Sequence, residues 1–175
     1  MEPKITTCLW FNNNEAEAAA AHYVAIFNNA PVNASHPASR ILSRTRYLEA
    51  GREHHRQEPG STMTVAFTLR GQPFVALNGG SQGWSFSPAV SFMISCADQT
   101  EVDYFWEKLR EGGDKEQERC GWLADRFGVS WQVVPVSLIE MLGSGDEGCV
   151  SRVTAEMMGQ TKLDIAALEK AFRGE

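Results

Sequence analysis

The sequence lacks the features that several classes of protein require. Its 16 lysines and arginines are outnumbered by 22 acidic residues, and no basic run interrupts the net charge of −6. That balance works against binding a phosphate backbone, so we expect no nucleic-acid partner. Residues 1–4 do not begin a signal peptide, and no apolar run approaches the length that crosses a bilayer. We therefore expect a cytoplasmic protein with no membrane partner.

Cysteines are few and widely spaced. The four are Cys8, Cys96, Cys120 and Cys149, and none forms a CxxC pair, so neither a zinc knuckle nor a disulfide framework is indicated. We expect Cys8, Cys96 and Cys120 to be buried as small apolar residues. The alternative for Cys120 is a reactive thiol, because the cation of the neighbouring Arg119 favours the thiolate.

The length and composition predict a single globular domain at residues 1–175. Within it, two halves of the chain begin in the same way, with a strand followed by a helix. Residues 5–11 and 90–96 alternate large apolar and smaller side chains, which predicts a strand in each. Asn14 with Glu17, and Asp98 with Glu101, then have the spacing of a helix N-cap. The apolar residues that follow have the spacing of one buried helical face: Ala19, Tyr23, Ile26 and Phe27 in the first helix, and Val102, Phe105, Trp106 and Leu109 in the second.

Strands rather than further helices follow each of these helices. Residues 40–48, 63–69 and 74–77 are the candidates in the first half, and residues 129–134 in the second, where residues 115–124 are ambiguous. Residues 49–61 are polar and without periodicity, so they predict a loop. Helical spacings return after Pro135. The sequence predicts an α+β fold of two tandem βαβββ modules, at about 4–80 and 88–135, with a helical C-terminal extension at 136–175, and it excludes a Rossmann fold.

Several motifs together resemble the PhnB-like, 3-demethylubiquinone-9 3-methyltransferase-like family of the vicinal oxygen chelate (glyoxalase/bleomycin resistance protein/dioxygenase) superfamily. They are residues 5–11, 63–67, 74–80, 120–123, 127–132 and 163–168, so the resemblance covers nearly the whole chain. Residues 32–39 look like a short insertion relative to that family. The resemblance implies two mixed sheets curled around a cavity, and a homodimer, to which Met157 and Met158 could contribute apolar surface.

The alternation of side chains along a strand allows the cavity face to be predicted. If Leu9 and Phe11 face the helices, the opposite parity faces the cavity. By that reasoning the candidate ligand-binding residues are Cys8, Trp10, Thr64, Ala76, Asn78, Ser91, Met93, Ser130 and Gln132. This mixture of small, polar and soft apolar groups is typical of a small-molecule pocket.

The superfamily implies a divalent metal held by His and Glu side chains on the first and last strands of each module. The matching places here hold Thr7 or Cys8 and Ala76 or Asn78 in the first module, and Ser91 and Gln132 in the second. These neutral donors suit such a cation poorly, so we expect no metal site and no cofactor. The pair His54-His55 lies in a charged loop, where solvated side chains are the simpler interpretation.

The glycine-rich stretch at 78–83 follows a strand but precedes no helix, so it predicts a turn between the modules rather than a nucleotide-binding loop. The leading hypothesis is a protein that binds a small organic molecule without the superfamily metal. The alternatives are an enzyme, either methyltransferase-like or metal-dependent with unconventional ligands, and a regulatory partner protein whose helical C-terminus is the interface. The sequence identifies neither the ligand nor a catalytic residue.

Overall fold

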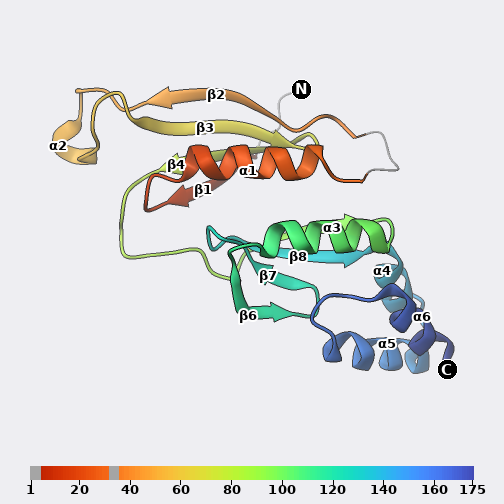
Figure 1. The fold of residues 1–175 in the computed structure, drawn as a ribbon. Helices are drawn as coiled ribbons and strands as arrows, with labels where there is room; N and C mark the ends of the chain where they lie inside the picture. Colours follow the sequence, from red (N-terminus) through yellow and green to blue (C-terminus); the bar gives the residue numbers. More distant parts are fainter. Residues whose placement is uncertain (1–4, 32–35) are drawn as a thin grey trace. The chain divides into compact units, whose positions relative to one another are not determined.

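The computed structural model describes residues 5–31 and 36–175, so the predicted insertion at 32–39 lies partly outside the described residues. The chain divides into two compact units, one with residues 5–29 and 36–85, the other with residues 30–31 and 86–175. Each unit carries one four-stranded sheet (Figure 1). Among the described residues, no helix is both long and apolar enough to cross a membrane.

Module one is a βαβββ unit with one extra helical turn. Its elements are β1 (Thr7–Phe11), α1 (Ala16–Asn28), β2 (Arg40–Arg46), α2 (Arg52–His55), β3 (Thr62–Leu69) and β4 (Gln72–Asn78). The strand order is β1-β4-β3-β2; β1 runs parallel to β4, and the other neighbours are antiparallel. The predicted strands are confirmed with small shifts at their ends. The expected loop at 49–61 contains the short helix α2.

Module two repeats this order and continues into three helices. Its elements are β5 (Phe92–Cys96), α3 (Gln99–Arg110), β6 (Asp114–Arg119), β7 (Trp122–Ala124), β8 (Ser130–Pro135), α4 (Val136–Leu142), α5 (Glu147–Gly159) and α6 (Ile165–Arg173). The sheet order is β5-β8-β7-β6, and β5 runs parallel to β8 as β1 does to β4. The two βαβββ modules and the helical extension are thus confirmed.

The segment at 115–124, ambiguous in sequence, forms the hairpin of β6 and β7. Arg119 and Trp122 are cross-strand partners, so Cys120 and Gly121 make a two-residue turn. Both have positive φ, 49° and 80°, as tight hairpin turns of this length require.

One helix covers one face of each sheet, and its predicted apolar residues form the core. Helix α1 lies along the β1-β4-β3-β2 sheet (Figure 1). Its residues Ala19, Tyr23, Ile26 and Phe27 are buried. Val102, Phe105, Trp106 and Leu109 of α3 are buried in the same way in module two. Both helical stripes are therefore confirmed.

The N-terminus of α1 is capped by a side chain of β4, which is distant in the sequence. The backbone N–H of Ala16 donates to Asn78 Oδ1 at 2.9 Å, and Asn78 Nδ2 donates to the Thr62 carbonyl at 3.0 Å. The predicted cap by Asn14 with Glu17 is wrong, because Asn14 adopts φ 63°, outside the extended region that a capping residue uses. Glu17 instead pairs with Arg44 at 2.6 Å.

The N-terminus of α3, in contrast, is capped locally. The Asp98 side chain accepts a hydrogen bond from the Glu101 N–H at 3.0 Å, and Glu101 Oε2 accepts one from the Ala97 N–H at 2.8 Å. The predicted pairing of Asp98 with Glu101 is confirmed.

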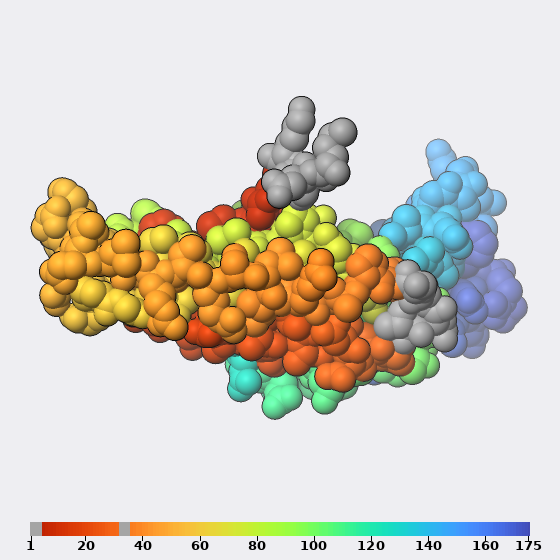
Figure 2. All heavy atoms as spheres, turned by 90° about the horizontal axis from the view of Figure 1, so that it is seen from above, coloured from red at the N-terminus to blue at the C-terminus, as the bar shows by residue number. Residues whose placement is uncertain are grey.

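Strand β2 lies at the edge of its sheet and is exposed along most of its length. Figure 2 shows this strand and the loop that carries α2 at the surface, both in orange. Arg40, Arg44 and Arg46 lie along β2, and charged side chains of this kind discourage another chain from pairing with an open edge.

We predict that Asn78→Ala lowers the free energy of unfolding by about 2 kcal/mol, because it leaves a buried N–H and a carbonyl without their partner. Urea unfolding followed by circular dichroism measures the change. Asn14→Gly is the matched control: it keeps the positive φ, and we expect a change of less than about 0.5 kcal/mol. Equal stability of Asn78→Ala and the native chain would contradict the assigned cap.

Candidate functional site: a pocket in the second module

The register of module one separates the predicted cavity residues into two groups. We call the sheet face turned away from α1 or α3 the open face. Cys8, Trp10 and Thr64 lie on it, since their partners are Val75, Leu77 and again Leu77. The predicted placement of Ala76 and Asn78 on this face is wrong. Ala76 pairs with Leu9 and Asn78 with Phe11, so both belong to the buried face under α1.

In module two the predicted parity agrees with the register. Met93 pairs with Gln132 across β5 and β8, and Gln132 Nε2 donates to Ser91 Oγ at 2.8 Å, so all three share the open face. Ser130 has the same parity as Gln132, but its side chain is buried. Phe92, Trp131 and Val133 occupy the opposite face, toward α3.

The places that the superfamily uses for metal ligands do not suit a divalent cation. Ser91 and Gln132 are hydrogen-bonded to each other, and on the open face of module one Cys8 lies beside Val75 rather than beside Ala76 or Asn78. A hydroxyl, an amide and a thiol are weak donors for a hard cation. Within residues 5–31 and 36–175, no group of three or more His, Cys, Asp or Glu side chains is placed to hold a metal.

Trp10 is held by its own module. Its Nε1 donates to the Gly80 carbonyl at 2.9 Å, and its ring packs edge-on against Trp84 with centroids 5.6 Å apart. A Cβ at Gly79 would lie 2.1 Å from the Trp10 indole, so only glycine fits there. The glycine-rich stretch at 78–83 therefore contributes close packing at the end of β4, and no helix follows it.

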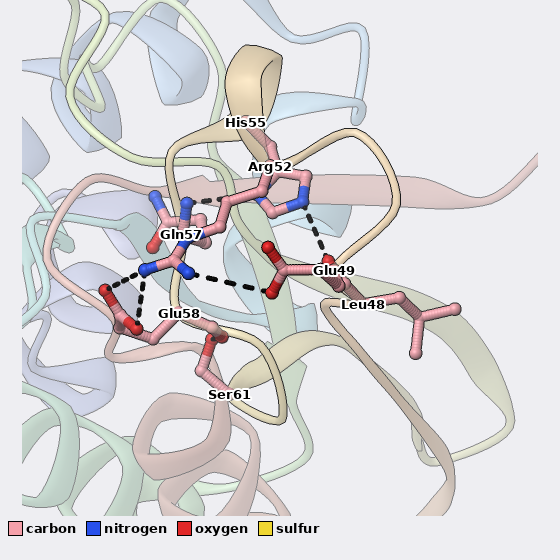
Figure 3. Close-up of polar contacts among 7 residues, drawn as sticks. All are labelled: Leu48, Glu49, Arg52, His55, Gln57, Glu58 and Ser61. Atoms are coloured by element: carbon pink, nitrogen blue, oxygen red, sulfur yellow. Dashed lines mark hydrogen bonds and ion pairs between the residues drawn. The ribbon is translucent and has the colours of Figure 1, made fainter.

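The two adjacent histidines have different surroundings. His54 is exposed, with Nε2 3.4 Å from Glu53. His55 is half-buried and packs on the Tyr47 ring. Its Nδ1 accepts from the Gln57 N–H at 3.0 Å, and its Nε2 lies 3.2 Å from the Leu48 carbonyl (Figure 3). His54 is solvated as predicted, whereas the prediction of a solvated loop side chain is wrong for His55, which ends α2 and organises the following turn through both ring nitrogens.

The cysteines are less uniformly buried than expected. Cys96 is buried, as predicted, but Cys8 is exposed on the open face and Cys120 is partly exposed at the β6–β7 turn. The prediction that Cys8 and Cys120 are buried is therefore wrong. Cys120 Sγ lies 3.8 Å from both the carbonyl oxygen and the sulfur of Met158.

A pocket of about 690 Å³ lies entirely within the second compact unit, between the open face of the module-two sheet and the helical extension. One row of cross-strand partners forms its floor: Met93 of β5 pairs with Gln132 of β8, Gln132 with Trp122 of β7, and Trp122 with Arg119 of β6. Two of the nine predicted ligand-binding residues, Met93 and Gln132, line this pocket. Trp122 and Arg119 were missed because the β6–β7 hairpin that sets their parity was ambiguous in sequence.

The C-terminal extension supplies the remaining walls, which are apolar. The lining residues from this part are Leu138, Ile139, Leu142, Met157, Met158 and Leu163. Met158 is 65% exposed, whereas Met157 packs against the extension's own core of Leu138, Met141, Val153, Leu163 and Leu168. Met157 is thus partly buried rather than exposed, and the contribution of Met157 and Met158 to a homodimer stays a prediction. Helical spacing alone could not have shown that α4 and α5 face the sheet.

Three sets of polar contacts hold the extension against module two. Gln99 accepts from the Ile165 N–H at 2.9 Å and donates to the Leu163 carbonyl at 3.1 Å. The N–H groups of Cys120 and Gly121 donate to the carbonyls of residues 160 and 161. Lys162 pairs with Asp103 of α3 at 2.7 Å, and the nearby ammonium lowers the pKa of this carboxyl. These contacts hold the segment around Leu163, which lines the pocket, against both α3 and the β6–β7 hairpin.

The fold and the pocket define a class: a two-module α+β protein with an apolar pocket on one sheet. The sequence model of the family described as 3-demethylubiquinone-9 3-methyltransferase matches residues 3–134. The chain belongs to this family. The match ends at β8, so the helical extension that walls the pocket lies beyond it.

Two solved structures illustrate the relationship. The PhnB protein from Bacillus cereus is 31% identical, over 77% of this chain and 100% of that one, with a TM-score of 0.60. A protein from Pseudomonas aeruginosa is 16% identical, over 77% of this chain and 98% of that one, with a TM-score of 0.53, which concerns the fold alone. No curated protein matches the sequence.

We predict that the Lys162–Asp103 pair contributes stability that is lost in acid. Because the pKa of Asp103 is lowered in the folded state, this contribution is present above the ordinary carboxyl pKa and disappears as the pH falls through the folded-state pKa. At pH 7, Asp103→Asn should cost about 0.5 kcal/mol, a value usual for exposed pairs. The difference from the native chain should shrink between about pH 5 and pH 2.

Chemical unfolding across this pH range measures the effect. Glu111→Gln removes the same charge just after α3, at an exposed position without an ion pair among the described residues, and serves as the control. A gap between Asp103→Asn and the native chain that stayed constant with pH would refute the assignment.

Proposed function

We propose that this chain binds a small, largely apolar organic molecule in the pocket of module two, without a divalent metal. The observation that carries the proposal is the lining: a sheet floor with Met93 and Trp122 is faced by leucine, isoleucine and methionine side chains of the extension. Pockets for small molecules commonly have volumes of about 300–1,000 Å³ with mostly apolar walls, and about 690 Å³ lies in that range.

The chemistry of the walls supports a ligand with a flat or flexible apolar body. Methionine side chains adapt to irregular shapes, and three of them, Met93, Met157 and Met158, line the pocket. Trp122 offers an aromatic face of the kind on which rings stack. The Gln132 amide, bonded through Nε2 to Ser91, has its Oε1 available to accept a hydrogen bond and orient the ligand.

Methyl transfer to a ring hydroxyl of a demethylated quinone is the second candidate function. The family description names 3-demethylubiquinone-9, whose ring and polyprenyl chain make it an apolar molecule of the kind proposed here. Calorimetric titration with S-adenosylmethionine and a short-chain quinone analogue tests this candidate. Absence of heat with both compounds would remove it and leave the binding proposal standing.

Homodimerisation and a cytoplasmic location stay predictions.

We predict that the neutral dye N-phenyl-1-naphthylamine binds the pocket saturably, with enhanced fluorescence. Ile139→Trp fills part of the pocket from α4 and should weaken binding at least about tenfold, which corresponds to about 1.4 kcal/mol. Fluorescence titration gives both affinities.

Val136→Trp is the matched control. Val136 is also an exposed apolar residue of α4, but it does not line the pocket, so this variant should bind like the native chain. Dye binding that is absent in the native chain, or equal in Ile139→Trp and Val136→Trp, would contradict the proposal.

A further inference from the structure

The pocket contains one charged side chain, and no carboxylate of the described residues pairs with it. Arg119 is the only charged residue of the lining. Among the described residues it has no ion pair and no side-chain hydrogen bond. The neighbouring carboxylate, Glu118, has the opposite parity on β6 and pairs with Arg110 of α3 at 3.1 Å. The cation of the nearby loop, Lys162, is likewise engaged with Asp103.

Arg119 stands at one end of the cross-strand row that forms the floor. Its partner across the hairpin is Trp122, and Gln132 and Met93 continue the row toward β5. The indole N–H of Trp122 has no hydrogen-bond partner among the described residues, so the residue paired with Arg119 carries a second donor. Among the described residues, the β6–β7 end of the floor thus holds the one charged group of the lining, while the extension contributes only apolar side chains.

This polarity has a chemical consequence for the ligand. A guanidinium binds carboxylates and sulfonates through a pair of N–H donors, and the apolar walls beside it reduce competition from water once a ligand covers the floor. Arg119 is exposed, so a neutral ligand would gain nothing from its charge, whereas an anionic group would pair with it. The net charge of −6 repels anions in general, so binding of an anion here requires this local cation.

Resting on the proposed function, we infer that the ligand is a monoanionic amphiphile: an apolar, preferably aromatic, body with one carboxylate or sulfonate that Arg119 binds. The body lies over Trp122 and Met93 against the methionines and leucines of the extension. The anionic group lies at the β6–β7 end, within reach of the Trp122 N–H.

Two dyes with the same aromatic body test this inference. 8-Anilino-1-naphthalenesulfonate carries a sulfonate that N-phenyl-1-naphthylamine lacks. We expect both to bind the full-length native chain. Arg119→Gln should weaken the sulfonate dye about tenfold and the neutral dye less than about twofold, because only the former uses the guanidinium. Added salt should weaken only the sulfonate dye.

Arg126→Gln is the matched control, since Arg126 is an exposed arginine of the same module that does not line the pocket. It should leave both affinities unchanged. Equal effects of Arg119→Gln on both dyes, or none on either, would overturn the inference while the proposed pocket stands. Failure of both dyes to bind the native chain would overturn the proposed function and the inference together.

Discussion

The parallel pairing of the first and last strands of each module determines most of what this structure does. In module two, β5 and β8 are in register from Phe92 with Trp131 to Cys96 with Pro135. Side chains alternate, so this register decides which residues lie under α3 and which lie on the open face. A slip of one residue would exchange Val133 with Gln132 and bury an amide among aromatic rings.

Polar contacts within module two reinforce that register. The Asp125 carboxylate is buried just before β8 and accepts hydrogen bonds from the Val129 N–H at 3.0 Å and from the Trp131 indole at 2.8 Å. Trp131 is thereby held on the α3 side, which leaves Gln132 on the pocket floor. The apolar extension then covers this floor, anchored by Gln99 and by the β6–β7 turn. The pocket is thus a product of the sheet register and of chain segments outside the family match.

The sequence allowed much of the fold to be predicted and only part of the site. Strands and helices with strong periodicity, such as the α3 stripe ending at Leu109, are confirmed because burial imposes a regular spacing. Met93 and Gln132 were found by strand parity. Ala76 and Asn78 were placed on the wrong face because the register of β4 against β1 does not follow from either strand alone. Arg119 and Trp122 depended on a hairpin with charged, weakly patterned strands.

The N-terminal caps of α1 and α3 separate what the sequence predicts from what only the folded structure shows. The Asp98 cap joins residues three apart, so the sequence alone determined it, along with the βαβββ order and the buried helical faces. The Asn78 cap joins residues 62 apart, and only the folded sheet brings them together. The same holds for the pocket, whose floor and walls come from separate segments. Local patterns encode what neighbours in the chain do, whereas strand register and helix docking depend on long-range packing that no local pattern specifies.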